Sequence, residues 1–479
     1  MLDAKWIREN AEQVKLTAVR KGIDVSVDEW LELDTERRRL KSETDLLRER
    51  RNRLSAEMGR LMQSKRKAEG VQPDTGAEAA GDRAELNAGD ETAGEREQSK
   101  QHETEAESIR EQMQFVNGRL GQLEEELIGA EQRFAAIHEK MPNPASPDTP
   151  IGRSDEGNVE LTRVGTPPAF GFKARDHMEL GDIHGLIDVP RGVKTAGSRH
   201  YYLKGAGVLL HRAVQQLAMD MLLAQGFTPL EVPLMVKEEA MSHTAFFPMG
   251  RDQAFHLPEE DRYLVGTSEV PLMMYYSGEI VDVEEPIKLA AASVCFRSEV
   301  GSAGRDVRGL YRVHQFAKVE QVVICRAVPE ESEAMLQAIT GNAERLLMEL
   351  ELPYRKVAVC TGDMSQKTYK QYDLETWMPS RDAYGETHSS SNLHDFQARR
   401  ANIRYKDENG VLRYCHTLNN TAVASPRILI PLLENHQRED GSIYIPPALR
   451  PYMNGLAELR AAGKKEPDGY DTPLPGNMD

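Results

Sequence analysis

The stretch that decides the fold is ASVCFRSEVGSAGRDVRGLYRVHQFAKVEQ, residues 292–321. An apolar run ends at Phe296, a loop containing Gly and Arg covers about 300–310, and β-forming residues continue to Ile324. The pattern predicts two antiparallel strands joined by a long loop. Side chains alternate in direction along a strand, so five of those on the second strand share one face: Arg312, His314, Phe316, Lys318 and Glu320.

Charged side chains that alternate along a hairpin often form the solvated face of a half-covered sheet. Arginines, an aromatic ring and carboxylates on one surface also suit a ligand that carries a phosphate, a flat base and an amine. The residue string favours the second interpretation. FRSE, followed by a loop and then HQFxKVEQ, resembles the second signature motif of class II aminoacyl-tRNA synthetases. The residues of this motif are most similar to those of the seryl-tRNA synthetases.

The chain of 479 residues has a formal net charge of −17 and the composition of a soluble globular protein of two or three domains. It has no apolar run of the roughly eighteen residues that a membrane helix needs, and its first residues lack the apolar core of a signal peptide. We therefore expect a cytoplasmic protein without a membrane segment. The four cysteines (Cys295, Cys325, Cys360 and Cys415) form no CxxC pair, which favours reduced thiols over a disulfide framework or a zinc site.

Two segments near the N-terminus carry heptad repeats. In the first, leucine recurs every seven residues at Leu33, Leu40, Leu47, Leu54 and Leu61. In the second, apolar residues at alternating spacings of four and three run from Ile109 to Met141. Neither segment contains proline, so we expect two long helices folded back on each other as an antiparallel coiled coil.

The first of these helices is strongly basic, with twelve Lys and Arg residues between Arg37 and Lys67. A local cluster of this kind attracts a polyanion even in an acidic protein, because phosphate attraction acts within roughly a Debye length, about 8 Å at physiological salt. Oligomerisation is the commoner use of a coiled coil, but resemblance to the seryl family implies an arm that grips the long variable arm of tRNA. The tRNA-contacting arginines that we expect are Arg37, Arg38, Arg48, Arg51, Arg53 and Arg60.

The other boundaries follow from composition. Residues 68–103 are rich in Gly, Ala, Glu and Asp, which predicts a flexible acidic insert at the tip of the arm that either repels stray RNA or is inert. Pro, Asp and Gly are frequent in residues 142–168, which predicts a linker. The arm is then residues 1–141 and the catalytic domain residues 169–479.

The resemblance covers nearly the whole chain except the insert and the tail after Asn454. It implies an α+β fold, in which a class II catalytic domain built on an antiparallel sheet follows the coiled-coil arm. The segment GFTPLEVPLM, residues 226–235, is predicted to be a strand ending at Pro233. In class II synthetases a strand of this kind lies at the dimer interface, so the resemblance implies a homodimer.

The short polar segment Thr267-Ser268-Glu269 is, taken alone, equally compatible with a helix cap. The family resemblance places six residues at the L-serine site: Thr267, Glu269, Arg297, Glu320, Asn419 and Thr421. Glu320 would hold the ammonium group, while Asn419 and Thr421 would line the side-chain pocket. A site that hydrogen-bonds a hydroxyl rejects analogues that lack it. Alanine should therefore be excluded because it has no hydroxyl, and threonine because it is too large for the pocket.

The same resemblance assigns the ATP contacts. Arg297 would hold the α-phosphate, where a fixed planar cation lowers the repulsion that the attacking carboxylate meets. Glu299 would accept the adenine amino group, Phe316 would stack under the base, and Arg312 would add a charge near the phosphates. The expected ATP-binding set is Arg297, Ser298, Glu299, Arg312, Val313, Phe316, Glu386, Thr387, His388, Ser389 and Arg427.

The segment YGETHSSSNLHDFQARR, residues 384–400, resembles a family stretch that reads YxEISSCSNCxDFQARR. Glu386 and Ser389 fall on residues that contact ATP and its metal, and hard oxygen ligands suit Mg²⁺ rather than zinc. Thr387, His388 and Ser390 depart from the family pattern. A histidine at this place either donates to a phosphate or is a packing substitution.

LNNTAVASPR, residues 418–427, resembles one of two family versions of the third motif. A helix is expected to start near Pro426, since proline suits a first turn, and Arg427 would meet the γ-phosphate. Arg297, Glu299 and Arg427 are thus the expected catalytic residues. No GxxxxGK[ST] or GxGxxG motif is present, so ATP is not expected to bind in either of those ways.

The predicted activity is ATP-dependent attachment of L-serine to tRNA(Ser) through seryl-adenylate and, by family resemblance, to tRNA(Sec) as well. Two other functions are considered. A paralogue that activates another small amino acid or loads a carrier protein would generally lack the arm. An inactive RNA-binding or regulatory protein would not need Arg297, Glu299, Glu320 and Arg427 together.

Overall fold

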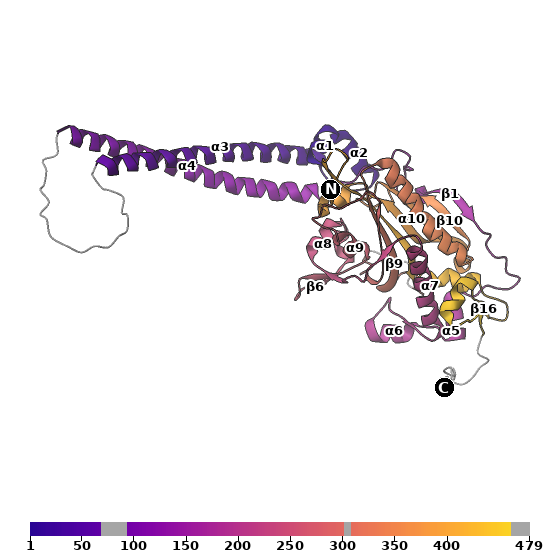
Figure 1. The fold of residues 1–479 in the computed structure, drawn as a ribbon. Coiled ribbons are helices and arrows are strands. Elements are labelled where there is room, and N and C mark those ends of the chain that lie inside the picture. The colour runs from indigo at the N-terminus through magenta and orange to yellow at the C-terminus, as the bar shows by residue number, and fades with distance from the viewer. Residues whose placement is uncertain (69–92, 301–307, 461–479) are drawn as a thin grey trace. The chain divides into compact units, whose positions relative to one another are not determined.

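The computed structural model describes residues 1–68, 93–300 and 308–460 (Figure 1). The chain divides into two compact units, one of residues 26–138 and the other of residues 1–25 with residues 139–479. The first 25 residues therefore belong to the unit that contains the sheet, whereas the sequence placed them in the arm.

The arm consists of α3 (Val27–Ala68) and α4 (Ala93–His138). Ion pairs of Glu36 with Arg133 and of Lys65 with Glu103 show that the two helices are antiparallel. Because a helix rises 1.5 Å per residue, the 42 residues of α3 extend over about 63 Å. Residues 93–103 are helical, which corrects the predicted insert at its C-terminal side; residues 69–92 lie outside the described residues.

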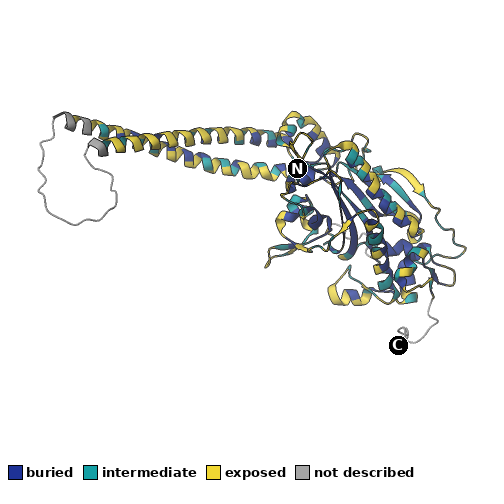
Figure 2. Ribbon diagram, viewed as in Figure 1, coloured by how far each residue is buried: buried dark blue, intermediate teal, exposed yellow. Residues whose placement is uncertain are grey.

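The heptad positions form the seam between these helices, as predicted. Leu40 packs with Leu123 and Ala130, and farther along the arm Leu54 packs with Val116. Leu40 is fully buried, whereas most residues on the outer faces of the two helices are exposed (Figure 2). The arm is thus held by an apolar seam only one side chain wide on each helix.

The second unit is built on an eight-stranded sheet with the order β1-β10-β11-β12-β15-β9-β8-β4. All neighbours are antiparallel except β4 and β8, so the predicted α+β fold with a mostly antiparallel sheet is confirmed. In that order the strands are Val159–Val164, Tyr354–Ala358, Lys370–Met378, Ala383–Asn392, His416–Ser425, Gln315–Cys325, Ile287–Phe296 and Thr228–Pro229. Two expectations are corrected: β1 lies inside the predicted linker, and the strand predicted to end at Pro233 is only Thr228–Pro229.

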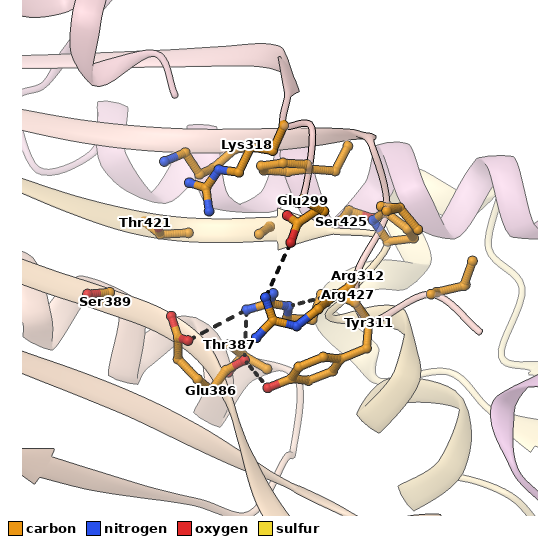
Figure 3. A pocket seen from close by; sticks show the side chains of 16 residues that line it. Glu299, Tyr311, Arg312, Lys318, Glu386, Thr387, Ser389, Thr421, Ser425 and Arg427 are labelled. Atoms are coloured by element: carbon orange, nitrogen blue, oxygen red, sulfur yellow. Dashed lines mark hydrogen bonds and ion pairs between the residues drawn. The ribbon is translucent and has the colours of Figure 1, made fainter. Parts of the chain in front are cut away.

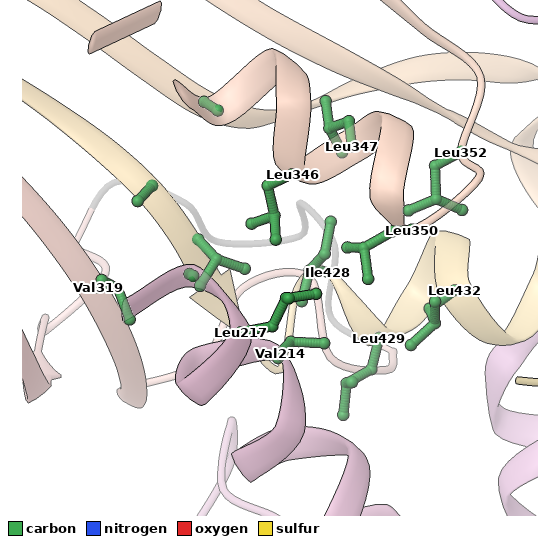
Figure 4. Close-up of a cluster of buried hydrophobic side chains, with 14 of the residues drawn as sticks. Val214, Leu217, Val319, Leu346, Leu347, Leu350, Leu352, Ile428, Leu429 and Leu432 are labelled. Carbon is green, nitrogen blue, oxygen red and sulfur yellow. The ribbon is translucent and has the colours of Figure 1, made fainter. Parts of the chain in front are cut away.

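The β8–β9 hairpin lies near the centre of this sheet, and its register pairs Ala291 with Glu320 and Cys295 with Phe316. Alternation sends Val319 and Val323 to the face covered by α7 (Ala206–Leu223), α10 (Pro329–Glu349) and α12 (Leu429–Asn435) (Figure 4). Phe316, Lys318 and Glu320 point to the other face. The predicted separation of a core face from a chemical face is therefore present.

Short helices and ribbons complete the unit. The helices are α1 (Ala4–Glu9), α2 (Ala11–Arg20), α5 (His177–His184), α6 (Val189–Ala196), α8 (Glu238–His243), α9 (Glu269–Met274) and α11 (Phe396–Ala401). The small strand pairs are β2 (Ile187–Asp188) with β3 (Tyr202–Leu203), β13 (Arg404–Lys406) with β14 (Leu412–Tyr414), and β16 (Ile443–Tyr444) with β17 (Glu458–Leu459). A three-stranded ribbon contains β5 (Met235–Val236), β7 (Arg262–Leu264) and β6 (Phe255–Leu257).

The described helices include none whose length and apolar character would let it cross a bilayer. All four cysteines are buried free thiols. Burial raises the pKa of Cys415 to about 12, so this thiol stays protonated at neutral pH.

Candidate active site

Two adjoining cavities open on the chemical face of the sheet, between the β8–β9 hairpin, β12 and β15. Phe316, Val313 and Leu310 line the first cavity, and Thr267, Glu269 and Asn419 line the second. Eight residues face both: Arg297, Glu299, Arg312, Lys318, Glu386, Ser389, Thr421 and Arg427. The charged residues that the sequence singled out are therefore brought together by segments up to 130 positions apart in the chain, from Arg297 to Arg427.

The end of the hairpin carries a cation, an aromatic ring and an ion pair. Arg297 donates from Nε to the Gly266 carbonyl at 3.2 Å, and its guanidinium lies 5.3 Å from the centroid of the Phe316 ring. Glu299 Oε2 lies 3.3 Å from Arg312 Nη1 (Figure 3). Glu299 also has a φ of 52°, in the left-handed region that non-glycine residues rarely adopt and that is enriched at functional sites.

Arg427 closes the first cavity from the opposite side. Its Nε donates to the Tyr311 carbonyl and its Nη1 to the Glu386 carbonyl, both at 3.2 Å. The guanidinium also lies over the Tyr311 ring, 4.4 Å from its centroid, a cation–π contact. Arg427 lies in a turn that precedes α12. The predicted helix start near Pro426 is therefore corrected, since α12 begins at Leu429.

A buried clasp holds the backbone next to Tyr311. His177 Nδ1 lies 2.8 Å from Glu434 Oε1, and Leu310 donates its backbone N–H to His177 Nε2 at 3.3 Å. Glu434 is fully buried and accepts further hydrogen bonds from Ser380. Gly309, at φ 91°, passes so close to this imidazole that a Cβ there would lie 2.2 Å from Nε2. The start of α5 thereby fixes one wall of the first cavity.

At the junction of the cavities a lysine lies between two predicted site residues. Lys318 Nζ is 2.7 Å from Glu320 Oε2 and donates to Thr267 Oγ1 at 2.6 Å. Asn419 and Thr421 donate to the two carboxylate oxygens of Glu320 at 3.3 and 3.4 Å. Asn419 Oδ1 is buried without a partner among the described residues, so it is free to accept a hydrogen bond from a bound ligand.

Glu269 forms the far wall of the second cavity, at the start of α9. Its Oε1 accepts hydrogen bonds from Lys367 Nζ and from Gln397 Nε2, each at 2.6 Å. The carboxylate is buried and its position is therefore fixed by two donors.

Two carboxyl side chains, Asp373 on β11 and Glu386 on β12, lie where these strands pair. Glu386 and Ser389 line both cavities, and Asp373 lies behind them, paired in register with Ser389. Burial, and then the charge of Glu386, raise the pKa of Asp373 well above its usual value. Among the described residues, Arg427 is the cationic side chain that pairs with the Glu386 carboxylate, at 3.8 Å. This acidic oxygen-donor set fits a hard divalent cation such as Mg²⁺, although no cluster of three or more His, Cys, Asp or Glu with metal-binding geometry occurs among the described residues.

Two residues of the expected ATP-binding set are not placed in either cavity. His388 is buried, its Nδ1 lies 2.8 Å from Thr387 Oγ1, and its Nε2 has no hydrogen-bond partner in the described structure. Burial lowers the pKa of His388 to about 3, so the ring is neutral and carries no charge for a phosphate. Ser298 donates its hydroxyl to the Asp252 carbonyl, outside the cavity walls.

The sequence placed Lys318 on the same face of the second strand as Phe316 and Glu320 but assigned it no role. It missed Tyr311 and Lys367, because their contacts with Arg427 and Glu269 join segments about 100 positions apart.

The six arginines predicted to contact tRNA lie on α3 and are not equally accessible. Arg37 is half-buried against the Phe134 ring and pairs with the buried Asp34. Arg48 pairs with Glu124 of α4 at 2.8 Å. Arg38, Arg53 and Arg60 are exposed, whereas Arg51 is half-buried. The arm thus offers a smaller exposed cationic surface than the sequence count indicated.

Comparison with known proteins agrees with this architecture. Residues 255–436 match the family model described as the tRNA synthetase class II core domain (G, H, P, S and T). Residues 1–79 match the seryl-tRNA synthetase N-terminal domain. The sheet and its cleft are therefore those of a class II aminoacyl-tRNA synthetase.

Individual relatives identify the family within this class of synthetases. The serine–tRNA ligases of Deinococcus radiodurans and Bdellovibrio bacteriovorus are each 39% identical, over 96% of this chain and over 99% and 100% of their own lengths. The solved seryl-tRNA synthetase of Pyrococcus horikoshii, complexed with ATP, is 35% identical with a TM-score of 0.80 and covers 97% of this chain and 100% of its own. The cytoplasmic serine–tRNA ligase of Naegleria fowleri, in complex with AMP, is 28% identical with a TM-score of 0.78, covering 97% and 99%. The chain belongs to the seryl-tRNA synthetase family.

Proposed function

We propose that this enzyme forms seryl-adenylate in the two cavities and then passes the seryl group to tRNA(Ser). The observation that carries the proposal is the group around Glu320. The buried Glu320 carboxylate accepts from Asn419 and Thr421 and pairs with Lys318, which also donates to Thr267. Asn419, Thr421 and Thr267 line the second cavity, and Arg297 faces both cavities. The relatives solved with ATP and with AMP support nucleotide binding by this enzyme.

The second cavity takes serine. Glu320 holds the ammonium group, and the unpaired Oδ1 of Asn419 offers an acceptor for a donor of the same ligand. Thr267, Glu269 and Thr421 surround the side chain, so the hydroxyl has hydrogen-bond partners that alanine would leave unpaired. Arg297, which faces both cavities, lies where the seryl carboxylate meets the α-phosphate.

The first cavity takes ATP. The adenine ring stacks on Phe316, beside Val313, and Glu299 accepts from its amino group. Arg312, Arg427 and Thr387 line the same cavity and lie within reach of the phosphates. His388 and Ser298 are not part of this set, because the His388 ring is buried and neutral and the Ser298 hydroxyl is bound to the Asp252 carbonyl.

In the first step a carboxylate oxygen of serine attacks the α-phosphorus, and the bond from that phosphorus to the bridging oxygen breaks. Pyrophosphate leaves with the electron pair. Arg297 stabilises the charge that develops on the α-phosphoryl oxygens, and Arg427 that on the leaving group. In the second step a terminal ribose hydroxyl of tRNA attacks the seryl carbonyl and AMP leaves.

Glu386 and Ser389 would hold Mg²⁺, which supplies positive charge to the phosphates when bound. The raised pKa of Asp373 beside Glu386 supports this assignment, because a bound cation would favour the ionised form of both carboxyl groups. Within the protein, Ser389 bonds to the Asp373 carboxyl group and accepts from Gln371 Nε2 at 3.1 Å, and these contacts fix its hydroxyl.

The experiment is ATP–pyrophosphate exchange with each amino acid in turn. Serine-specific exchange is expected, and replacement of Arg297 by Gln should lower it at least a hundredfold, since loss of one transition-state donor costs about that much. The control is Arg163→Gln, on the surface strand β1 away from the cavities. Exchange driven by another amino acid, or no exchange with any, would refute the proposal.

The family membership supports four further parts of the proposal. The arm binds tRNA(Ser); the enzyme also serylates tRNA(Sec); it works as a homodimer; and it resides in the cytoplasm. Serylation of a tRNA(Sec) transcript tests the second, and light scattering of the purified protein tests the third. No charging of tRNA(Sec) or a monomer mass would contradict the corresponding part.

A further inference from the structure

Lys367 lies on the segment that joins β10 to β11 and reaches the serine cavity from outside the sheet. Its Nζ is 2.6 Å from Glu269 Oε1, and both side chains are nearly buried, at 14% and 5% exposed. Gln397 donates to that same oxygen. Glu269 Oε2 accepts no hydrogen bond from the described residues, so it is the oxygen left for a ligand.

The backbone around Lys367 is held by residues from two distant parts of the chain. Lys21, at the end of α2, donates from Nζ to the carbonyls of Ser365, Gln366 and Thr368 at 3.1, 3.4 and 2.5 Å. Asn143 donates from Nδ2 to the Lys367 carbonyl and from its backbone to the Gln366 carbonyl, both at 2.9 Å. All four carbonyls of residues 365–368 are therefore bound from outside the segment.

Burying the Lys21 ammonium group in this arrangement costs free energy. Lys21 is only 6% exposed, and its ammonium meets carbonyl oxygens rather than a carboxylate. Burying a charge in such a setting disfavours the charged form, and burial lowers the pKa of Lys21 to about 7. The segment it holds contributes Ser365, Gln366, Lys367 and Thr368 to the wall of the second cavity.

We propose that Lys367 is a further specificity-determining residue of the serine site and that Lys21 and Asn143 are positioning residues for it. Lys367 and Gln397 occupy one oxygen of Glu269 and so aim the other at the hydroxyl of the substrate. The inference rests on the proposed function, since it assumes that the second cavity takes serine. It also gives the first 25 residues a role in substrate selection.

The test is serine-dependent ATP–pyrophosphate exchange by the full chain. Lys367→Met should raise the KM for serine about tenfold, the usual effect of losing a hydrogen bond to a charged group, while the KM for ATP stays within about twofold. Selection of serine over threonine should fall as well. Lys367→Arg, which keeps a cation, should recover most of both losses, and Lys21→Met should shift the KM for serine in the same direction.

The matched control is Lys356→Met. Lys356 pairs with Glu344 at 3.4 Å, both are similarly buried at 17% and 18%, and neither lines the two cavities. It should leave both KM values unchanged. If Lys21→Met does not fold, the variants Lys367→Met and Lys367→Arg still test the role of Lys367 in the serine site.

The results separate the two proposals. No serine exchange by the wild type refutes the proposed function. Normal exchange by the wild type together with an unchanged KM for serine in Lys367→Met refutes this inference alone. A lowered melting temperature with equal changes in both KM values would show a merely structural role and would also overturn it.

Discussion

His394 and His416 are stacked ring on ring inside the catalytic unit, 4.3 Å between centroids, and Tyr369 continues the column at 3.6 Å. His416 Nδ1 lies 3.1 Å from Ser332 Oγ, a neutral partner. Burial lowers the pKa of His394 to about 4 and of His416 to about 3. Both rings are therefore packed as neutral groups, and neither lines the two cavities.

Stability should consequently fall on acidification. The pKa of an unfolded histidine is about 6.5, so between that value and the folded values the unfolded chain binds protons that the folded chain does not, and the free energy of unfolding decreases as the pH falls. His416→Gln removes one such group. The loss of stability from about pH 6 to 4.5 should then be less steep by about 1.4 kcal/mol per pH unit, measured by urea unfolding at each pH.

The control for this prediction is His256→Gln, at an exposed histidine on β6. Its slope should match that of the wild type. A His416→Gln slope that also matched the wild type would contradict the assignment of a neutral buried ring.

At the scale of elements, the arm depends on its narrow seam. Leu40 is fully buried between α3 and α4, whereas Leu46 on the same helix is 63% exposed. Leu40→Ala should lower the stability of the coiled coil by about 3 kcal/mol, as for other buried Leu→Ala changes, and Leu46→Ala by less than about 0.5 kcal/mol. Hydrogen exchange of peptides from α3 and α4 in the full chain measures both.

The functional consequence should be confined to the tRNA step. Leu40→Ala should slow serylation of tRNA while serine-dependent pyrophosphate exchange stays at the wild-type rate. Equal loss of both activities would show that the arm is needed for adenylate formation.

The sequence predicted the elements whose pattern is local. The β8–β9 hairpin and both heptad helices repeat with the periods of strand and coiled coil, so the sequence predicted them. It also placed Phe316, Asn419 and Thr421 on strands, and these three side chains line the cavities. The start of α4 at Ala93 was missed because residues 93–103 have the polar composition of the acidic segment before them. Lys21, Lys367 and the His177–Glu434 clasp were missed because each contact joins residues that are distant in sequence, and no local period marks them.

At the scale of the whole molecule, an acidic protein with a basic arm should bind tRNA through local charge. Affinity should fall steeply with salt, because each phosphate contact releases a counterion. Replacing Arg38, Arg53 and Arg60 together by Gln should reduce the slope of log K against log salt by about two, at roughly 0.7 to 0.9 per contact. Filter binding over a salt series measures it, with exposed arginines of the other unit, Arg163, Arg191 and Arg413, changed as the control.

The central claim is that the nucleotide and serine lie side by side on the chemical face of the sheet. A crystal structure with a nonhydrolysable seryl-adenylate analogue tests it most directly. We predict the adenine on Phe316 with its amino group at Glu299, and the seryl ammonium at Glu320. The analogue bound elsewhere, with the two cavities empty, would contradict the account.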